Sequence, residues 1–349
     1  MRRSSGAMAL RGLCGGAVHL PGDPAYDLAR RAWNTAVDQR PAAVAYPADA
    51  AEVAAVVRAA RSLGLRVAPQ GTGQDAAALG ALSDAILLRT AAMTGVGVDA
   101  RARRAQVGAG MLWADVVERL SPLAALHPVV PDVGVVGFSL SGGLSYYGRA
   151  LGLQSNSVTA IEVVTADGDH VRTDSDHEPE LFWALRGGGA NFGVVTGLEF
   201  ALHAVGDVHA GLLAWDWTRA ESVVPRWTAW ATNAPDTVTT ALRITRMSPV
   251  APPGLRGRRL VVIDGAVLGP AAPVLAALRA LRPEVDTFAA VTPAALLRLR
   301  WAPEGPRAGG PDSVLLGELS PAAVDAFLTT VGPGSGARPR AAELSLIHI

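Results

Sequence analysis

The sequence has no lysine and a single cysteine, Cys14, among its 349 residues. One cysteine excludes a disulfide within the chain, and such sparing use indicates a reducing, cytoplasmic location. Without lysine, all 31 basic residues are arginine, and 31 acidic residues balance them. A formal net charge of zero, with no basic cluster, argues against nucleic acid or an anionic membrane surface as a partner.

Long apolar runs are absent as well. None reaches the ~18 residues that a membrane-spanning helix needs, so we expect no membrane partner. The pair Arg2–Arg3 suggests a twin-arginine export signal, but the residues that follow, SSGAMALRGLCGGAVHL, lack the apolar stretch of such a signal. The seven histidines show no His-x-x-x-His spacing, so we expect no metal site.

The chain is long enough for two domains, and half of its residues are hydrophobic. Residues 1–34 are predicted to form an irregular N-terminal segment, and 35–205 one α+β domain of two small lobes. In 206–331, strands such as 260–263 alternate with helices such as 271–281, which indicates a separate, substrate-facing domain. This part holds most of the tryptophans, whose spacing favours core positions over a substrate cage: Trp215, Trp217, Trp227, Trp230 and Trp301.

The C-terminal stretch 332–349 differs from the rest. Residues 332–340, GPGSGARPR, are linker-like, and ELSLIHI then ends abruptly. A strand that begins there without a partner would leave its backbone groups unpaired. We therefore expect either that the natural protein continues, so that the second domain is incomplete here, or that the last residues are not native sequence.

Local patterns predict the elements of the first domain. A helix is expected over 50–63, because Asp49 can cap it, Glu52 follows three residues on, and apolar residues recur at helical spacing. Strands are expected at 65–68 and 85–88, a hairpin at 97–99 and 104–107, and an amphipathic helix at 113–120. A strand at 157–165 turns at Asp167–Gly168 into 170–173, followed by a helix at 179–186, a loop at 187–189 and a strand at 193–202.

The stretch PQGTGQDAAALG places two glycines directly after a predicted strand. Gly71 and Gly73 would let backbone N–H groups turn inward as a nest for phosphate oxygens, and Thr72 adds a hydroxyl donor. The pattern Gly-x-Gly-x-x-Ala also matches the loose Rossmann fingerprint, which requires a helix to begin at the loop. Because AAALGALSDA is short and broken by Gly80, we disfavour a Rossmann site, and a plain tight turn is the simpler alternative.

A second segment, DVGVVGFSLSGGLSYYGRALGLQSN at 132–156, holds glycines at irregular spacing amid apolar residues. The spacing fits neither a helix nor a strand period. It suits a loop and a helix start that pack flat against a ring. A third glycine-rich segment, WALRGGGANFGVVTGLEF, follows at 183–200. We expect the backbone amides of the three segments to converge on one large, flat, anionic ligand.

Together these segments resemble the FAD-binding domain of the vanillyl-alcohol oxidase / p-cresol methylhydroxylase (PCMH) superfamily, and within it the berberine-bridge-enzyme-like branch. The matching stretches are 21–34, 40–73, 131–168 and 180–200, in the order that the family has them. The resemblance implies an α+β fold. A two-lobed PCMH-type FAD-binding domain over 35–205 would be followed by a truncated antiparallel-sheet substrate domain with helices over 206–331.

The resemblance also implies contacts to FAD. The first loop matches the family's pyrophosphate loop, the second segment lies along the isoalloxazine and pyrophosphate, and the third lies near the adenine. The implied cofactor-binding residues are Gln70, Gly71, Thr72, Gly73, Gln74, Pro131, Asp132, Val133, Gly134, Gly137, Phe138, Ser141, Gly142, Gly143, Asn156, Val158, Gly193 and Val195.

Two positions depart from the family pattern. The first loop usually ends in a histidine that bonds covalently to the flavin 8α-methyl, and this position is Gln74 here. Many relatives add a cysteine just before the second segment, and 127–131 holds none. Glutamine cannot act as the nucleophile. We therefore predict noncovalently bound FAD, with Gln74 contributing hydrogen bonds at most.

Tyr146 is the candidate catalytic residue, because a phenol near the flavin could assist proton removal from a substrate hydroxyl. The alternative is that one of Tyr146 and Tyr147 packs in the core and the other lies against the flavin ring as a wall. Arg149 is a candidate for stabilising the reduced flavin, with a surface ion pair as the alternative.

The implied activity is that of an FAD-dependent oxidoreductase, and of an oxidase in particular. A small-molecule substrate would give hydride from a C–H bond to flavin N5, with O₂ as the electron acceptor. A flavin dehydrogenase with another acceptor is one alternative. A degenerate, non-catalytic flavoprotein is the other, suggested by Gln74 and the short C-terminus.

Overall fold

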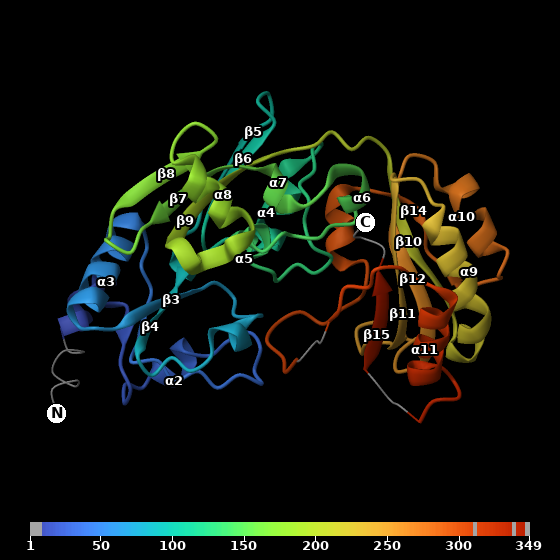
Figure 1. The fold of residues 1–349 in the computed structure, drawn as a ribbon, viewed down its shortest axis with the longest axis horizontal. Helices are drawn as coiled ribbons and strands as arrows, with labels where there is room; N and C mark the ends of the chain where they lie inside the picture. Colours follow the sequence, from blue (N-terminus) through green and yellow to red (C-terminus); the bar gives the residue numbers. More distant parts are fainter. Residues whose placement is uncertain (1–8, 310–312, 337–339, 346–349) are drawn as a thin grey trace.

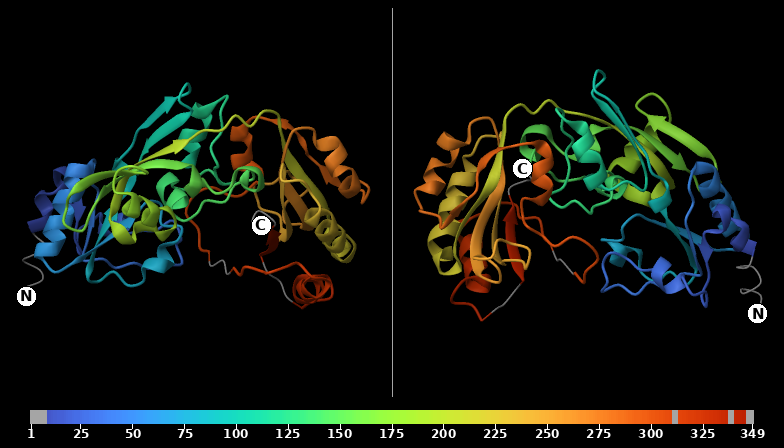
Figure 2. Two further views of the ribbon diagram at one scale, coloured as in Figure 1. Left: turned by 45° about the horizontal axis from the view of Figure 1, so that its top comes forward. Right: turned by 180° about the vertical axis from the view of Figure 1, so that it is seen from behind.

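The computed structural model describes residues 9–309, 313–336 and 340–345. Arg2, Arg3 and His348 lie outside these residues. The two N-terminal sheets lie beside each other at one end of the long axis of the molecule, and the C-terminal sheet lies at the other end (Figures 1 and 2).

The first lobe is a four-stranded sheet in the order β1-β2-β4-β3. Its strands are β1 (Val18–His19), β2 (Ala43–Ala45), β3 (Arg66–Gln70) and β4 (Ala85–Arg89). Strands β2, β4 and β3 run parallel, so their carboxyl ends lie at one edge of the sheet. Its short helical segments are η1 (Ala9–Gly12), η2 (Cys14–Gly16), α2 (Tyr26–Ala29) and η3 (Ala76–Leu79).

Helix α3 (Ala50–Ser62) packs its apolar face on this sheet. The predicted cap is present, because the Asp49 carboxylate accepts the Glu52 N–H at 2.9 Å and the Glu52 carboxylate accepts the Ala48 N–H at 2.8 Å. Sequence-local hydrogen bonds of this kind fix where the helix begins.

The second lobe is a five-stranded antiparallel sheet in the order β5-β6-β9-β7-β8. Its strands are β5 (Val96–Asp99), β6 (Arg104–Gly108), β7 (Val158–Val164), β8 (His170–Asp174) and β9 (Val194–Ala201). Its helices are η4 (Thr90–Ala92), α4 (Trp113–Val117), η5 (Glu118–Leu120), α5 (Val135–Leu140), α6 (Gly148–Leu151), α7 (Gln154–Ser157), α8 (Pro179–Gly188) and η6 (Gly189–Phe192). The predicted loop at 187–189 corresponds to a kink between α8 and η6, because Arg186 and Gly187 depart from helical φ and ψ and Gly189 has φ +64°.

The third sheet has the order β13-β10-β12-β11-β15, with β14 also paired to β10, and every pairing is antiparallel. Its strands are β10 (Val208–Asp216), β11 (Val238–Arg246), β12 (Arg259–Leu268), β13 (Val285–Asp286), β14 (Ala289–Val291) and β15 (Ala341–Ser345). The accompanying helices are η7 (Trp217–Arg219), α9 (Ala220–Thr232), α10 (Ala271–Arg279), η8 (Pro293–Arg298) and α11 (Pro321–Val331).

The C-terminal strand corrects one expectation. A strand in this stretch was expected to lack a partner, but β15 pairs with β11, from Thr245 opposite Ala341 to Ala241 opposite Ser345. Its backbone groups are thus used in the sheet. The rest of the predicted tail includes residues 337–339 and 346–349, which lie outside the described residues.

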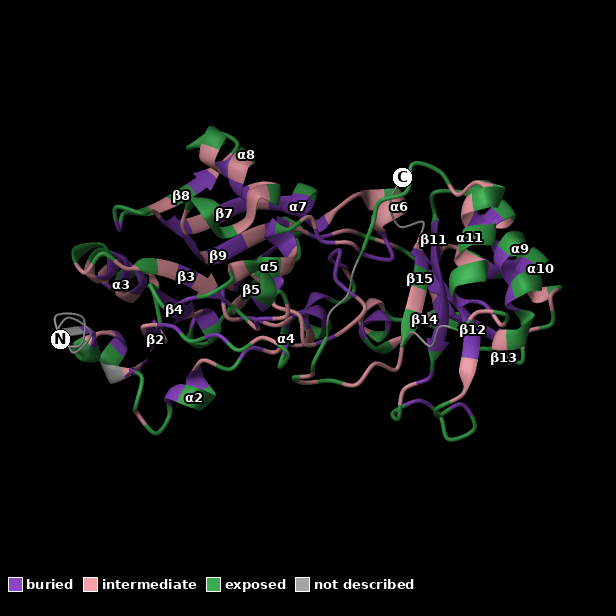
Figure 3. Ribbon diagram, turned by 60° about the horizontal axis from the view of Figure 1, so that its bottom comes forward, coloured by how far each residue is buried: buried purple, intermediate pink, exposed green. Residues whose placement is uncertain are grey.

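One face of the third sheet packs on α9, α10 and α11, and the other is turned toward the first two lobes (Figure 1). Trp215 and Trp227 are buried in the helix-covered core, as their spacing predicted. The central strands are buried along most of their length (Figure 3). The two halves of the molecule meet in an apolar cluster that includes Leu126, Tyr147 and Ala266.

The break between β9 and β10 falls where the sequence places the boundary between 205 and 206, and the domain limits themselves remain a proposal. Within the described ranges, no helix combines the length and apolar character needed to cross a membrane.

Candidate cofactor site

The first glycine loop, 70–74, leaves β3 at the carboxyl edge of the parallel strands. Gly73 has φ +83°, and a Cβ there would lie 2.6 Å from Gln70 Nε2 and 3.0 Å from Ala32 Cβ, so both conformation and space require glycine. The Trp33 and Asn34 N–H groups donate to the Thr72 and Gly73 carbonyls at 3.0 and 3.2 Å. Only the 3₁₀ turn η3 follows the loop, which agrees with the rejection of a Rossmann site.

The second segment begins helix α5. Gly134 occupies its N-cap, and the Val135 N–H donates to the Met111 carbonyl at 3.0 Å. Gly134, Gly137 and Ser141 lie at helical spacing, with Gly137 and Ser141 exposed. No atom lies within 4 Å of a Cβ built on Gly137, and the nearest atom to a Cβ on Gly134 is Thr72 Cγ2 at 3.9 Å. One stripe of α5 is therefore bare of bulky side chains, and its Gly134 end faces the first loop.

A polar junction joins the first two segments. The Gln74 amide donates through Nε2 to the Asp132 carbonyl at 3.0 Å. The Asp132 carboxylate accepts, at Oδ2, the Trp33 indole N–H at 2.7 Å and the Gly305 N–H at 2.8 Å. Gln74 thus ties the first loop to the second segment.

Residues 303–309 return from the second half of the chain and cross this junction; we call them the strap. Arg307 and the 33–35 segment exchange backbone bonds, as the Arg307 N–H donates to the Trp33 carbonyl and the Thr35 N–H to the Arg307 carbonyl. The Arg307 guanidinium lies 4.4 Å from the centre of the Trp33 ring. Trp33, Asn34 and the strap were not predicted as site residues, because their contacts join residues up to 275 positions apart.

The third segment reaches the site through η6 and the start of β9. A Cβ on Gly193 would lie 2.6 Å from both Val163 Cγ2 and Val164 O, so glycine allows this close approach to β7. A pocket of about 620 Å³ lies between α3, β3 and η6, lined in part by Pro69, Asn191 and Gly193. Its place beside the third segment fits the expected adenine end.

Three further residues predicted to contact the cofactor, Asn156, Val158 and Val195, differ in exposure. Asn156 is exposed, whereas Val158 and Val195 are buried in the core of the second lobe. Because these two valine side chains pack inward, any contact they make with a cofactor would come from their main chain.

Several buried polar atoms near the loops lack a hydrogen-bond partner among the described residues. They include both amide atoms of Gln70, Asp132 Oδ1 and Ser139 Oγ. An unpaired buried polar group costs about 1–3 kcal/mol, so a ligand rich in polar atoms fits this site.

Arg89 is a further member of the site that the sequence did not reveal. It lies opposite Gln70 in the parallel ladder, and its Nε and Nη1 are buried without a partner among the described residues. Burial lowers the pKa of Arg89, opposed by Tyr46. The only sequence signal is an arginine that ends the apolar strand AILLR, just beside the phosphate-type loop.

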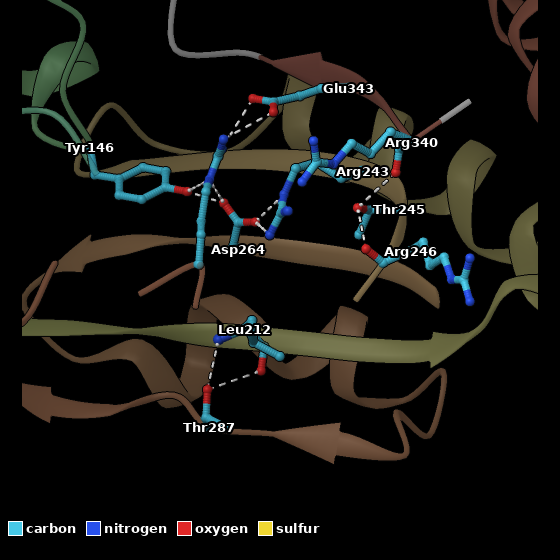
Figure 4. Close-up of polar contacts among 10 residues, drawn as sticks. Tyr146, Leu212, Arg243, Thr245, Arg246, Asp264, Thr287, Arg340 and Glu343 are labelled. Carbon is cyan, nitrogen blue, oxygen red and sulfur yellow. Dashed lines mark hydrogen bonds and ion pairs between the residues drawn. The ribbon is translucent and has the colours of Figure 1, made fainter. Parts of the chain in front are cut away.

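The tyrosines and Arg149 lie at the interface with the third sheet. Tyr146 is 2% exposed, and its hydroxyl donates to the Asp264 carboxylate (Figure 4). Tyr147 is also buried, and burial raises its pKa. Both side chains are therefore buried, whereas the alternative above placed only one of them in the core. Arg149 donates to the Ala234 and Val238 carbonyls, each at 3.0 Å, and pairs with Asp236 at 3.3 Å, which corresponds to the ion-pair alternative.

His127 is the histidine nearest the second segment in sequence, and both of its ring nitrogens lie beside backbone carbonyls. Nδ1 is 2.8 Å from Pro128 O and Nε2 is 3.2 Å from Pro293 O, while burial lowers its pKa. In the part of the chain that the structure describes, no three His, Cys, Asp or Glu side chains are grouped as a metal site.

Comparison with known proteins identifies the first half of the molecule. The family described as "FAD binding domain" matches residues 41–174. This stretch is an FAD-binding domain. Its homologues and fold neighbours lie in the vanillyl-alcohol oxidase / PCMH superfamily, as the motifs indicated.

Similar proteins are flavin-linked oxidoreductases. (R)-6-hydroxynicotine oxidase of Paenarthrobacter nicotinovorans is 34% identical over 203 residues, which are 57% of this chain and 44% of that protein. Xylooligosaccharide oxidase of Thermothelomyces thermophilus is 32% identical over 210 residues, 58% of this chain and 42% of that protein. The chain thus spans less than half the length of these relatives.

Solved structures agree with the fold beyond the FAD-binding domain. The crystal structure of 6-hydroxy-D-nicotine oxidase from Arthrobacter nicotinovorans has a TM-score of 0.72 at 26% identity, and the match covers 81% of this chain and 63% of that one. A BBE-like protein of Physcomitrella patens has a TM-score of 0.69 at 21% identity, covering 83% and 61%, which shows the fold alone.

The residues present fit FAD. The stripe of α5 at Gly134 and Gly137 leaves space for a ligand beside the first loop, and the unpaired atoms of Gln70, Asp132 and Arg89 offer donors and acceptors. The FAD-binding domain thus has space and polar partners where the sequence placed the cofactor.

Proposed function

We propose that the protein is an FAD-dependent oxidoreductase, and an oxidase in particular. The observation that supports it most directly is the junction of the first two glycine segments through Gln74 and Asp132, inside the matched FAD-binding domain. FAD, when bound, supplies the chemistry, since it accepts a hydride from a substrate C–H bond and passes electrons on, here to O₂.

The residues of the chain bind and orient the cofactor. The loop 70–74 and the residues Pro131, Asp132, Val133, Gly134, Gly137, Phe138, Ser141, Gly142 and Gly143 would hold its pyrophosphate and ring system. Asn156 and Val158 would follow that segment along the cofactor, and Gly193 and Val195 would lie near the adenine end. Tyr146 stays a proposed site residue, but its hydroxyl is bonded to Asp264, so a positioning role is better supported than direct proton transfer.

Noncovalent binding of FAD is part of this proposal. Gln74 has no nucleophilic atom for the flavin 8α-methyl, and its amide nitrogen already donates to Asp132. A cytoplasmic location and a small-molecule substrate are proposed as well, the first from the single cysteine and the second from the names of the oxidase relatives.

The test is made on the purified chain. It should be yellow, and acid precipitation should leave a colourless pellet with FAD in the supernatant. A pellet that retains the flavin would refute noncovalent binding, and a folded protein that takes up no FAD would refute the function.

The electron acceptor needs a second experiment. Candidate substrates are first mixed with the protein in the absence of oxygen, and those that bleach the flavin are identified. Air is then admitted. Rapid return of the flavin absorption is expected for an oxidase, whereas slow return supports a dehydrogenase. If no substrate class bleaches the flavin, the degenerate, non-catalytic alternative is favoured.

A further inference from the structure

A buried charged cluster lies on the face of the third sheet that is turned toward the FAD-binding domain (Figure 4). Its centre is Asp264 of β12, which is 0% exposed. Successive side chains of a strand point to opposite faces of the sheet. Val261 and Ile263 of β12 pack against the helices, so Asp264 points to the opposite face, as Ala266 does.

Three side chains donate to Asp264. One carboxylate oxygen accepts the Tyr146 hydroxyl and the Arg300 Nε–H, the latter at 3.0 Å. The other oxygen accepts the Arg243 Nε–H at 2.6 Å, and Arg243 Nη2 pairs with it as well. Both oxygens of this carboxylate are thus fully engaged.

The two guanidinium groups differ in whether they pair with a carboxylate other than that of Asp264. Arg300 has a second carboxylate, because its Nη1 and Nη2 each lie 3.0 Å from an oxygen of Glu343. Arg243 pairs with no second carboxylate, and its Nη2, although it lies beside Asp264, is buried without a hydrogen bond among the described residues. Arg243 is therefore the guanidinium with an open donor edge.

The charge at Arg243 is poorly compensated. Burial, together with the nearby Arg300 charge, lowers the pKa of Arg243 to about 9, while Glu343 opposes the shift. A bound anion would relieve this repulsion and satisfy the open N–H groups.

The cluster is close to the cofactor segment. Tyr146, which contacts Asp264, follows Gly143 by three residues. Around Arg243 on the same strand and face lie small side chains, Ala241 and Thr245. A substrate group that enters between the sheet and the FAD-binding domain would meet Arg243 without a bulky neighbour on that strand.

We propose that Arg243 binds a carboxylate group of the substrate, with Asp264 holding the guanidinium plane in place. The assignment rests on the proposed function, since it names a substrate class for the same site. Guanidinium suits this role because it is planar, always offers parallel N–H donors and pairs with carboxylates in fixed geometry.

The first test uses the FAD-loaded protein and two probes of equal shape. Benzoate and its uncharged amide, benzamide, are titrated by isothermal calorimetry and by flavin absorption. We expect benzoate to bind and to perturb the flavin spectrum, and benzamide to bind at least tenfold more weakly. Equal affinity for the two probes, or no benzoate binding, would overturn the proposal.

The second test uses variants. Arg243→Lys keeps a positive charge but loses the planar donor pair, so benzoate affinity should fall about tenfold. Arg246→Lys, an exposed residue of the same strand that donates to the Gly257 carbonyl, is the control and should bind as the parent does. Unchanged benzoate binding in Arg243→Lys would contradict the proposal.

The two levels of failure are distinguishable. If Arg243→Lys does not fold, the two probes on the parent protein still decide the question. A protein that binds no FAD refutes the proposed function, whereas a yellow protein indifferent to benzoate refutes only the carboxylate site.

Discussion

Trp33 donates its indole N–H to the Asp132 carboxylate at 2.7 Å, across 99 positions of sequence. The same carboxylate oxygen accepts the backbone N–H of Gly305 in the strap. The two bonds hold the N-terminal segment, the second glycine segment and the strap at one point, beside the loop that Gln74 completes. This junction sets the spacing between the two glycine segments.

Trp33→Phe tests the junction. Phenylalanine keeps a ring beneath Arg307 and removes only the N–H donor, so Asp132 loses one of its two bonds at Oδ2. We expect the free energy of unfolding to fall by about 1–3 kcal/mol. FAD affinity should fall about tenfold, which corresponds to about 1.4 kcal/mol. Thermal unfolding and titration of the FAD-free protein with FAD measure the two effects. Trp230→Phe, which removes an indole N–H bonded to the Val274 carbonyl between α9 and α10, is the control and should leave FAD affinity unchanged.

Gly137→Leu tests whether the bare stripe of α5 faces the cofactor. Leucine is a better helix former than glycine by about 1 kcal/mol, and no atom lies within 4 Å of a Cβ at this position. The chain without FAD should therefore be as stable as the parent or more so, while FAD binding should be lost. Ala51→Leu, at an exposed position of α3, should leave FAD binding intact. A Gly137→Leu protein that binds FAD normally would place the cofactor elsewhere.

Arg89→Met tests the unpaired guanidinium below the first loop. Methionine fills similar space without burying a charge, so the free energy of unfolding should be unchanged or higher. If Arg89 contacts a phosphate of FAD, the FAD affinity of the variant should fall about tenfold, or about 1.4 kcal/mol. The FAD affinity of the variant should also depend less on salt concentration than that of the parent. The control is Arg104→Met on β6, where the guanidinium is exposed and pairs with Glu199 at 2.9 Å. Equal FAD affinity in both variants would show that Arg89 does not contact FAD and interacts only with Tyr46 among the groups considered.

The Asp264 carboxyl should give the protein a pH-dependent stability. Burial raises its pKa to about 7, against the opposing effect of Arg300. Because the folded state then keeps a proton that the unfolded state has released, the contribution is greatest below about pH 4 and declines as the pH rises toward about 7. Each pKa unit is worth about 1.4 kcal/mol, so the decline is on the order of 4 kcal/mol.

Asp264→Asn removes this titration. Chemical unfolding of parent and variant is compared between pH 4 and pH 7. The free energy of unfolding of the parent minus that of the variant should decrease as the pH rises. Parallel curves for the two proteins would contradict the assigned pKa.

Helices, strands and turns that are determined by residues close in sequence could be predicted. Helix α3 was expected over 50–63 and is found at Ala50–Ser62, because its cap and apolar face are sequence-local. The hairpin of β5 and β6 and the turn from β7 into β8 were also found close to the predicted limits. The loop predicted at 187–189 is found as a kink between α8 and η6, where Gly187 and Gly189 take positive φ values.

The partners of buried polar groups were not predictable. The sequence pointed to Tyr146 as a candidate base, but not to Asp264, which lies 118 positions away. It pointed to Gln74 as a departure from the family, but not to the Asp132 carbonyl as its acceptor. Such pairs depend on how two sheets and a returning strap come together.

The sequence by itself determined the kinds of element, the three glycine segments and the family to which they belong. These follow from local backbone requirements, since glycine spacing, caps and alternation act within a few residues. Only the tertiary structure decided that the strap crosses Trp33, that Arg89 lies under the first loop, and that Arg243 keeps an open edge beside Asp264. Those relations arise from burial, where each polar group must find its partner among residues far away in the chain.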